Sequence, residues 1–406
     1  MSHSSIPWWG AAPTLAEAEL PVSADFVLVG GGIVGLATAY WLARAGARPL
    51  LLEREGVGAG ATGRNGGFLP IGTAEDYDAL VSRIGRERAR DLLHLTIANR
   101  RTADELLGSE EIDCDLRACG HLHLALDDGE QRVNRGLAAL LTEDGCATEV
   151  LNREEAQALV ATPFGPRIVG GLLFRDIALL HSGKLVRGLA AAALRRGATL
   201  ARGTVRALSG SAQGARVVTD RGTVDSSAVL LAVNAWTGAL LPALRPLITP
   251  VRGQVLAFAP IAPVFRTGMT ALTTVTEEYW QQTADGSIIL GGCRAVRPDR
   301  DEQALDISPT DDVQGALEAV LPGLFPAIGP LRVTHRWAGT MAFTRDRLPI
   351  VARLPDASGW AVGGFSGNGM SLGFIFGRIL ADQLLGGAAD PKLSIFSPDR
   401  LIGAPT

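Results

Sequence analysis

Glycines at a fixed spacing, followed by an acidic residue, are the first feature of this chain with a chemical consequence. Gly30, Gly32 and Gly35 form a Gly-x-Gly-x-x-Gly motif, and Glu53 ends the next apolar run. This spacing lets the backbone approach a pyrophosphate at a helix N-terminus, and an acid at that distance accepts hydrogen bonds from ribose hydroxyls. The motif predicts a dinucleotide site whose contacts are Gly30, Gly32, Ile33, Val34, Gly35, Glu53 and Arg54.

The segments around this motif predict a βαβ unit that would position it. Residues 25–29 are an apolar run fit for a buried parallel strand, a helical pattern continues to Ala45, and residues 49–53 form a second apolar run. A glycine-rich turn in an unrelated α/β protein is the alternative, and the complete set of flanking elements disfavours it.

Two further glycine-rich runs indicate a second ring system beside the nucleotide. Residues 58–67 follow the second strand, and residues 363–371 precede an amphipathic segment that predicts a last helix. Backbone N–H groups in such runs suit a flavin, whereas an NAD dehydrogenase with one nucleotide unit is the rival interpretation. The added candidate cofactor contacts are Ala61, Thr62, Arg64, Asn65, Gly66, Gly67, Gly367, Asn368, Gly369, Met370 and Ser371.

Nucleotide-type α/β segments occur at the start, middle and end of the chain, with β-rich stretches between them. This order predicts an α/β protein with a discontinuous, Rossmann-like FAD-binding domain and an inserted α+β substrate domain built on an antiparallel sheet. We expect an N-terminal arm (1–20), a FAD-binding domain (21–108, 161–236 and 335–390), a substrate domain (109–160 and 237–334) and a C-terminal tail (391–406).

Composition excludes several other functions. The 406 residues carry a net charge of −4 without a basic run, which argues against a nucleic-acid partner. Lys184 and Lys392 are the only lysines and neither stands in a phosphate-binding loop. The four cysteines form no Cys-x-x-Cys pair, and no long uncharged apolar stretch predicts a membrane span. With few cysteines and no signal peptide, we expect a cytoplasmic protein without a metal site.

Several ordered motifs together resemble the D-amino-acid oxidase-like flavoproteins, which include glycine, sarcosine and gamma-glutamylputrescine oxidases. The resemblance spans about residues 7–386. It implies FAD and oxidation of a carbon–nitrogen bond by hydride transfer to flavin N5, after which the imine is hydrolysed and an acceptor reoxidises the flavin. It also implies cofactor contacts at Val205, Asn234, Trp236 and Gly339. The motifs, beyond those above, are Leu230–Gly238, Pro250–Gln254, Arg336–Gly339, Thr344–Pro349 and Gly364–Gly369.

Departures from the family pattern are equally informative. Met341 stands where sarcosine oxidases carry the flavin-linking Cys and where glycine oxidases carry a carboxylate-binding Arg. Ser371 replaces a carboxylate-binding Lys, and the oxygen-activating Lys near 288–294 is missing, although Arg294 is a nearby cation. We therefore expect non-covalent FAD and a small amine or amino-acid-derived substrate other than glycine or sarcosine. The acceptor is oxygen or, in an amine dehydrogenase or a flavin subunit of an electron-transfer complex, a quinone or protein.

Other residues are candidates with a structural alternative. His121 and His123 share one face of a predicted strand, where they would line the substrate cavity or lie at the surface, and a metal site would need further ligands. The aromatic pair at 279–280 would line the substrate cavity or belong to an ordinary strand core, and the arginine at 252 would position the substrate or flavin or lie in a surface turn. Candidate catalytic residues are Asn368, Tyr279, Arg252 and His123, and candidate substrate contacts are Phe68, Tyr279, Trp280 and Met341.

Overall fold

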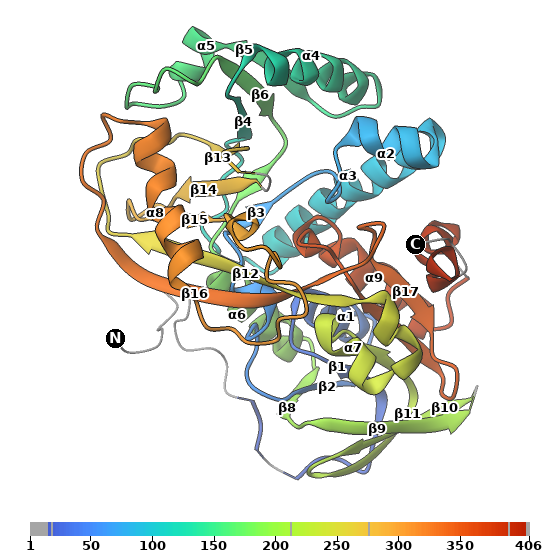
Figure 1. Cartoon of the computed structure of the whole chain (residues 1–406). Helices are drawn as coiled ribbons and strands as arrows, with labels where there is room; N and C mark the ends of the chain where they lie inside the picture. The colour runs from blue at the N-terminus through green and yellow to red at the C-terminus, as the bar shows by residue number, and fades with distance from the viewer. Residues whose placement is uncertain (1–14, 18, 212, 275–276, 389, 403–406) are drawn as a thin grey trace.

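The computed structural model describes residues 15–17, 19–211, 213–274, 277–388 and 390–402. Most of the expected N-terminal arm, including Trp8 and Trp9, lies outside the described residues. The described part of the chain contains two eight-stranded sheets and a two-stranded ribbon of β3 (Phe68–Leu69) and β7 (Ala178–Leu179), and helices cover or connect the sheets (Figure 1). None of the described helices is long and apolar enough to cross a membrane.

The first sheet contains the predicted βαβ unit. Its central strands β18, β11, β1, β2 and β8 are parallel, and antiparallel partners flank them at one edge and extend from β11. The strands, in spatial order and then off this path, are β17 (Ile350–Arg353), β18 (Gly359–Gly363), β11 (Gly222–Leu231), β1 (Ser23–Val29), β2 (Pro49–Glu53), β8 (Thr199–Arg202), β10 (Gly214–Thr219) and β9 (Val205–Ser211).

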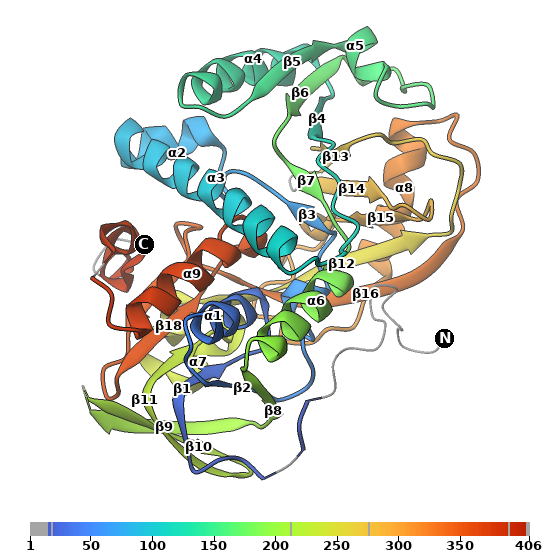
Figure 2. The ribbon, with the colours of Figure 1, turned by 180° about the vertical axis from the view of Figure 1, so that it is seen from behind.

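Alternate side chains of these strands enter two different cores. Leu28 packs with helices α1 (Ile33–Arg44), α6 (Ser182–Arg195) and α9 (Gly373–Leu384), which lie together on one face of the sheet (Figure 2). Its neighbour Val27 packs with the β9–β10 hairpin on the other face. Because both faces are covered, the strands read as continuous apolar runs rather than as an alternating pattern.

The second sheet is antiparallel except where β13 runs parallel to β4. One face packs against helix α8 (Asp311–Leu324) in a second apolar core. The strands in spatial order are β16 (Val333–Phe343), β12 (Thr249–Phe258), β15 (Ile288–Gly291), β14 (Glu278–Gln282), β13 (Gly268–Ala271), β4 (His121–Ala125), β6 (Gly170–Phe174) and β5 (Thr148–Asn152).

The remaining helices connect the two sheets or cover their ends. The long helix α3 packs against α9 and α2, and α2 contacts α4 (Figure 1). The helices are α2 (Tyr77–Ile84), α3 (Arg86–Ser109), α4 (Asp128–Glu143), α5 (Arg153–Gln157) and α7 (Thr237–Leu240), with 3-10 turns η1 (Ala61–Gly63), η2 (Asn234–Trp236), η3 (Pro242–Leu247), η4 (Arg294–Val296), η5 (Gly369–Ser371), η6 (Pro391–Phe396) and η7 (Pro398–Leu401).

Two strands depart from the predicted division of the chain. Residues 161–236 and 335–390 were assigned to the cofactor domain, yet β6 and most of β16 lie within the second sheet. Likewise β5 interrupts the stretch 130–160, which has a helical pattern in the sequence. Each of these strands is defined by pairing with residues distant in the chain, which local periodicity does not reveal.

Trp280 was a candidate substrate contact, and the structure contradicts this prediction. Its side chain is fully buried in the second core, with its ring centroid 5.9 Å from those of both Phe265 and Phe325. Neighbouring Tyr279 points to the opposite face, because successive side chains of a strand alternate. Only one of the two aromatic residues could therefore face a cavity on that side.

We predict that Trp280→Ala lowers the free energy of unfolding by about 3–5 kcal/mol, because it removes a large buried side chain from a packed core. Urea denaturation measures the change. Leu194→Ala, on α6 and 41% exposed, is the control and should stay within about 0.5 kcal/mol. Unchanged stability in Trp280→Ala would contradict the core assignment.

Candidate functional site

A large cavity of about 1470 Å³ is lined by residues from both sheets. Pockets for single small ligands usually measure about 300–1,000 Å³, so the space accommodates more than one such molecule. The predicted cofactor contacts that line it are Gly30, Gly32, Ile33, Val34, Glu53, Arg54, Ala61, Thr62, Arg64, Asn65, Gly66, Val205, Asn234, Trp236, Gly339, Gly367, Asn368, Gly369 and Met370.

The turn between β1 and α1 needs glycine for two distinct reasons. Gly30 has φ +110°, and a Cβ there would stand 2.5 Å from the carbonyl oxygen of Ala232. A Cβ at Gly35 would collide with the Gly30 carbonyl, so this residue holds the helix against the strand from behind the cavity. Gly32, by contrast, has an ordinary extended backbone (φ −85°) and would contact only the Thr62 hydroxyl, at 3.2 Å.

Glu53 connects the turn to the end of β2. Its carboxylate accepts hydrogen bonds from the backbone N–H groups of Gly31 (2.8 Å) and Glu55 (2.8 Å). A carboxylate offers about four lone-pair sites, so further acceptor capacity remains for ribose hydroxyls. At the same end of the cavity the Arg54 guanidinium lies 4.7 Å from the centre of the Trp236 ring.

The second glycine-rich loop is held to the cavity wall by side chains. The Thr62 hydroxyl accepts from Ile33 N (3.1 Å), and Asn65 caps its own loop through Thr62 O (2.7 Å). Arg64 donates to the carbonyls of Ala59 (2.6 Å) and Ala338 (3.1 Å). Burial lowers the pKa of Arg64. This loop and the one at residues 367–370 thus both contribute to the wall of the cavity.

Four other predicted contacts do not line the cavity. Gly35 lies behind the turn, and Gly67, with φ +80°, accepts at its carbonyl from Leu180 N and Gln281 Nε2. Ser371 is fully buried and its hydroxyl donates to the Asn368 carbonyl (2.8 Å). Arg252, a candidate catalytic residue, instead donates to Asp301 (2.6 Å) and Asp306 (3.1 Å). Its guanidinium therefore holds the loop 299–308 and not a substrate.

Aromatic side chains line the part of the cavity next to the two loops. Phe68 lies 5.7 Å from Tyr279 and 5.4 Å from His121, measured between ring centroids. Met341 and Phe343 line the wall contributed by β16, next to Gly367. Burial raises the pKa of Tyr279 to about 12, which keeps the phenol neutral. The predicted substrate contacts Phe68, Tyr279 and Met341 thus all line the same cavity.

His121 and His123 do share one face of β4, and the Thr270 hydroxyl lies between them. The hydroxyl is 3.0 Å from His121 Nε2 and 3.0 Å from His123 Nδ1. Burial lowers the pKa of His121 to about 3. Burial also opposes charge on His123, but Glu277, with its carboxylate 3.4 Å away, outweighs it and raises that pKa. A hydroxyl has one proton, so Thr270 can donate to only one of the two rings and must accept from the other.

No group of three or more metal-ligating side chains is present among the described residues, so the two histidines have no such cluster around them. The acidic residues close to the two histidines were not predicted from the sequence. Glu277 and Asp76 line the cavity, and burial followed by the charge of Glu277 raises the pKa of Asp76. Neither residue stands in a motif, and only the folded chain brings them to His123.

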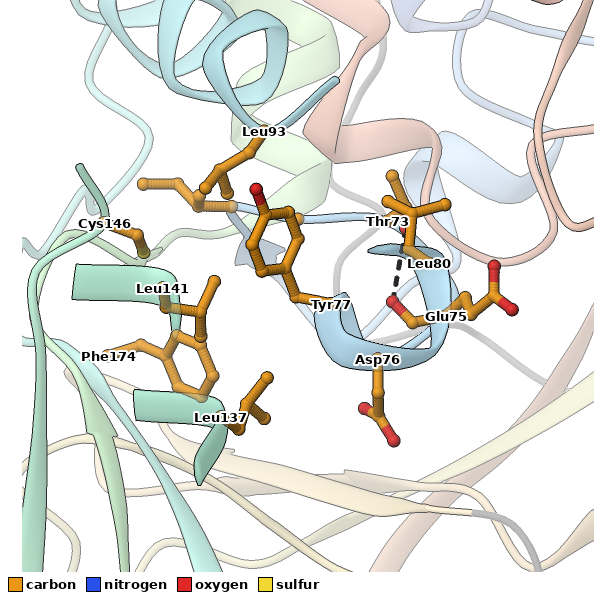
Figure 3. A pocket seen from close by; sticks show the side chains of 12 residues that line it. Thr73, Glu75, Asp76, Tyr77, Leu80, Leu93, Leu137, Leu141, Cys146 and Phe174 are labelled. Carbon is orange, nitrogen blue, oxygen red and sulfur yellow. Dashed lines mark hydrogen bonds between the residues drawn. The ribbon is translucent and has the colours of Figure 1, made fainter. Parts of the chain in front are cut away.

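A smaller pocket of about 100 Å³, with polar and apolar lining residues, adjoins the large cavity and shares six lining residues with it (Figure 3). Tyr77 and Leu80 of α2, Leu93 of α3 and Leu141 of α4 lie around it (Figure 3). The Tyr77 hydroxyl donates to Asp144 (2.8 Å) and so ties α2 to the end of α4. The shared residues are Ile71, Thr73, Glu75, Asp76, Leu137 and Phe174.

We predict that Gly32→Val abolishes binding of the nucleotide cofactor while the chain still folds. The backbone at Gly32 suits any residue, and Thr62 Oγ1 is the only described protein atom within 4 Å of a Cβ, so the new side chain fills cofactor space. Flavin absorbance of the purified protein, with far-ultraviolet circular dichroism, measures both effects. Gly108→Ala, in open space on α3, should retain full flavin. Normal flavin content in Gly32→Val would contradict this placement.

We predict that Glu277→Gln lowers the pKa of His123, because burial then acts on the ring without the opposing carboxylate. Titration of the histidine ring signals by NMR measures it. Glu130→Gln is the matched control with a smaller decrease, because Glu130 acts on His123 through charge alone.

The pair of His123 and Glu277 stabilises the fold within a pH window that is limited at high pH by the titration of His123 and at low pH by that of Glu277. The raised pKa of His123 means that its contribution is complete below the unfolded pKa and is lost as pH rises through the folded one. The lowered pKa of Glu277, due first to its hydrogen bond with His123, gives a contribution that is lost as pH falls. Equal decreases of the His123 pKa in Glu277→Gln and Glu130→Gln would contradict the pairing of His123 with Glu277.

Comparison with known proteins gives consistent matches along the chain. A family model described as FAD dependent oxidoreductase matches residues 25–383. Gamma-glutamylputrescine oxidoreductase of Escherichia coli (strain K12) is 29% identical over 383 residues, covering 90% of this chain and 85% of that protein. A subunit of opine oxidase from Agrobacterium tumefaciens (strain Ach5) is 27% identical over 390 residues, covering 93% and 97%.

The fold is shared with solved structures as well. A crystal structure of glycine oxidase from Geobacillus kaustophilus superposes with a TM-score of 0.81 at 22% identity, covering 94% of this chain and 100% of that one. The family match spans both sheets and every glycine-rich loop of the cavity. The chain therefore belongs to the FAD-dependent oxidoreductases of the D-amino-acid oxidase type, enzymes that act on amines and amino acids.

Proposed function

We propose that this enzyme oxidises the C–N bond of a small amine or N-substituted amino acid. When bound, the family's FAD supplies a two-electron acceptor that takes hydride at N5, and the resulting imine hydrolyses to a carbonyl compound. The observation that carries the proposal is the continuity of one cavity, whose walls include the glycine loops, the aromatic pair Phe68 and Tyr279, and Met341.

The residues present fit a flavin nucleotide held without a covalent bond. Glu53 with Arg54 and Trp236 would hold the adenosine side, and the turn at residues 30–33, where α1 begins, would lie against the pyrophosphate. The loop at 367–370 would contact the ring system. No cysteine is among the described residues that line this cavity, which supports release of the cofactor on denaturation.

The protein's own contribution is to orient an uncharged amine and to keep water from it. Hydride loss needs a nitrogen lone pair, so the substrate ammonium must first lose its proton. Tyr279, with a pKa of about 12, stays protonated and serves as a hydrogen-bond donor or an apolar wall and not as a base. Asn368, half-buried in the loop at 367–370, offers polar contacts without charge.

A second candidate is an amine dehydrogenase, or the flavin subunit of an electron-transfer complex that uses a quinone or protein acceptor. Lys392 and Lys184 are both described and neither lines the cavity, and Lys184 pairs with Asp115 at 2.5 Å. Reduction of oxygen benefits from a nearby cation, and since no described lysine lines the cavity, an arginine such as Arg294 would have to serve; the absence of the family's lysine supports another acceptor. The relative named as part of an opine oxidase supports the complex.

An amine panel assayed in two ways separates these candidates. The purified protein should be yellow, and should oxidise secondary amines with either peroxide formation or reduction of an artificial electron acceptor. Peroxide formation at a rate comparable to reduction of the artificial acceptor supports the oxidase. Reduction of the artificial acceptor without peroxide formation supports the dehydrogenase. Substrate oxidation that requires a co-purified partner supports the complex, and a colourless protein that reduces NAD would contradict all three.

We predict that sarcosine and glycine are poor substrates and that Met341→Arg improves sarcosine turnover. Met341 cannot form the bidentate pair with a carboxylate, and such a charge-assisted contact is worth about 1.5–3 kcal/mol, or ten- to a hundredfold in binding. Steady-state kcat/KM for sarcosine against bulkier secondary amines measures the preference. Efficient sarcosine turnover by the unaltered enzyme would contradict this assignment of the site.

A further inference from the structure

A cation without a carboxylate partner stands in the substrate part of the cavity. Arg294 lines the cavity, and its guanidinium carbon lies 4.9 Å from the centre of the Phe343 ring. Among the described residues, no acidic oxygen lies within ion-pair distance of Arg294. The charged residues that act on Arg294 are two cations, Arg347 and Arg300, and two acids, Glu302 and Asp301.

The nearest buried acid is already engaged elsewhere. Asp301 accepts from Arg252 (2.6 Å), Arg297 (2.9 Å) and Gln254 (2.9 Å), which uses its carboxylate for the loop that covers β12. Burial, followed by the charge of Arg347, lowers the pKa of Arg294 without removing its charge at neutral pH. A half-buried guanidinium in such surroundings gains most from an added anion.

The backbone directs this arginine out of the sheet. β15 ends at Gly291, and the buried Cys293 has a left-handed conformation (φ +57°), which is unusual for a residue with a side chain. The chain then turns into η4, whose first residue is Arg294. Strained conformations of this kind persist where the surroundings enforce them, frequently at binding sites.

The predicted substrate contact Tyr279 and the cavity-lining Phe343 lie close to this guanidinium. Phe343 packs under it, and Tyr279 lies near enough for the charge of Arg294 to act on its phenol. The Tyr279 side chain covers Gly291 at the end of β15, where any larger residue would collide with it. Arg294 is thus next to the aromatic compartment and not at the adenosine end of the cavity.

The position of Arg294 differs from that of an arginine at 341. Met341 and Phe343 share one face of β16, and residues two apart on a strand are separated by about 7 Å. The Arg294 guanidinium over Phe343 therefore lies several bond lengths along the strand from the place of the residue 341 side chain. A carboxylate bound there would be separated from the reacting carbon by a spacer.

We propose that Arg294 binds a substrate carboxylate that is remote from the oxidised C–N bond, so that the preferred substrates are amines with a carboxylate several atoms away. This inference rests on the proposed amine oxidation and names its substrate class. It accounts for how a carboxylated substrate is held although Met341 offers no anchor, and it agrees with the prediction that α-amino acids as short as glycine and sarcosine are poor substrates.

A series of N-methylamino acids with increasing spacer length tests the proposal: sarcosine, N-methyl-β-alanine, N-methyl-4-aminobutanoate and N-methyl-5-aminopentanoate, with N-methylbutylamine as the counterpart without a carboxylate. We expect kcat/KM to rise with spacer length, and the best member to exceed N-methylbutylamine about ten- to a hundredfold. Arg294→Met should remove this advantage, measured within each protein as the ratio of kcat/KM for the carboxylated amine to kcat/KM for N-methylbutylamine. Arg294→Lys should restore part of it.

Matched variants exclude general effects of charge and packing. Arg266→Met removes an exposed cation next to the second sheet outside the cavity, and should leave the spacer dependence unchanged. Met341→Arg, with Arg294 intact, should shift the preference toward sarcosine. An unchanged ratio of carboxylated to uncharged substrate in Arg294→Met would overturn the proposal.

A binding measurement separates this inference from the proposed reaction. Pentanoate and pentanamide are titrated into the purified holoenzyme, with binding followed by calorimetry and by perturbation of the flavin spectrum. If none of the amines is oxidised, the proposed reaction fails for this series. Loss of pentanoate binding in Arg294→Met, with pentanamide unaffected, would still support Arg294 as the carboxylate site. Equal binding of pentanoate by both proteins would refute it.

Discussion

Close approach of backbone to backbone at the first turn is the constraint on which the rest of the site depends. Gly30 faces the carbonyl of Ala232, which follows β11, and Gly35 presses α1 onto the same turn. Because β1 lies between β11 and β2, any side chain here would separate strands that must remain about 4.7–4.9 Å apart. Gly32 lies at the same turn but has room on the cavity side, so its lack of a side chain serves the ligand.

The pleat of the second sheet divides its residues between stability and chemistry. On β14, Trp280 enters the core and Tyr279 enters the cavity, and on β4 Leu122 is buried in the same core while His121 and His123 face the cavity. One apolar layer thus fixes the positions of the polar layer behind it. A shift of one residue in either strand would exchange the two faces, so core packing and substrate contacts cannot change independently.

The cofactor side was largely predictable from the sequence because its signals are local. Glycine spacing, an apolar run and a terminal acid all occur within residues 25–67, and all of the nucleotide contacts predicted there line the cavity except Gly35 and Gly67. The substrate side was not predictable from the sequence, because its walls are formed by strands that pair with one another although they are far apart in the chain. Adjacent residues 279–280 were treated as equivalent, although strand alternation alone separates them, and Glu277 reaches His123 only through the pairing of β13 with β4 and β14.

Charge is distributed unevenly over the substrate walls, and this bears on how a substrate is oriented. Glu277 and Asp76 lie near His123, whereas Arg294 lies over Phe343, and Arg347 acts by charge on both Asp76 and Arg294. On one substrate molecule, an ammonium group would be drawn to the acids and a carboxylate to the arginines. Because the amine must be uncharged to react, a carboxylate interaction is the one that can hold such a molecule throughout the reaction. Orientation would then depend on the cation at 294 more than on any acidic residue.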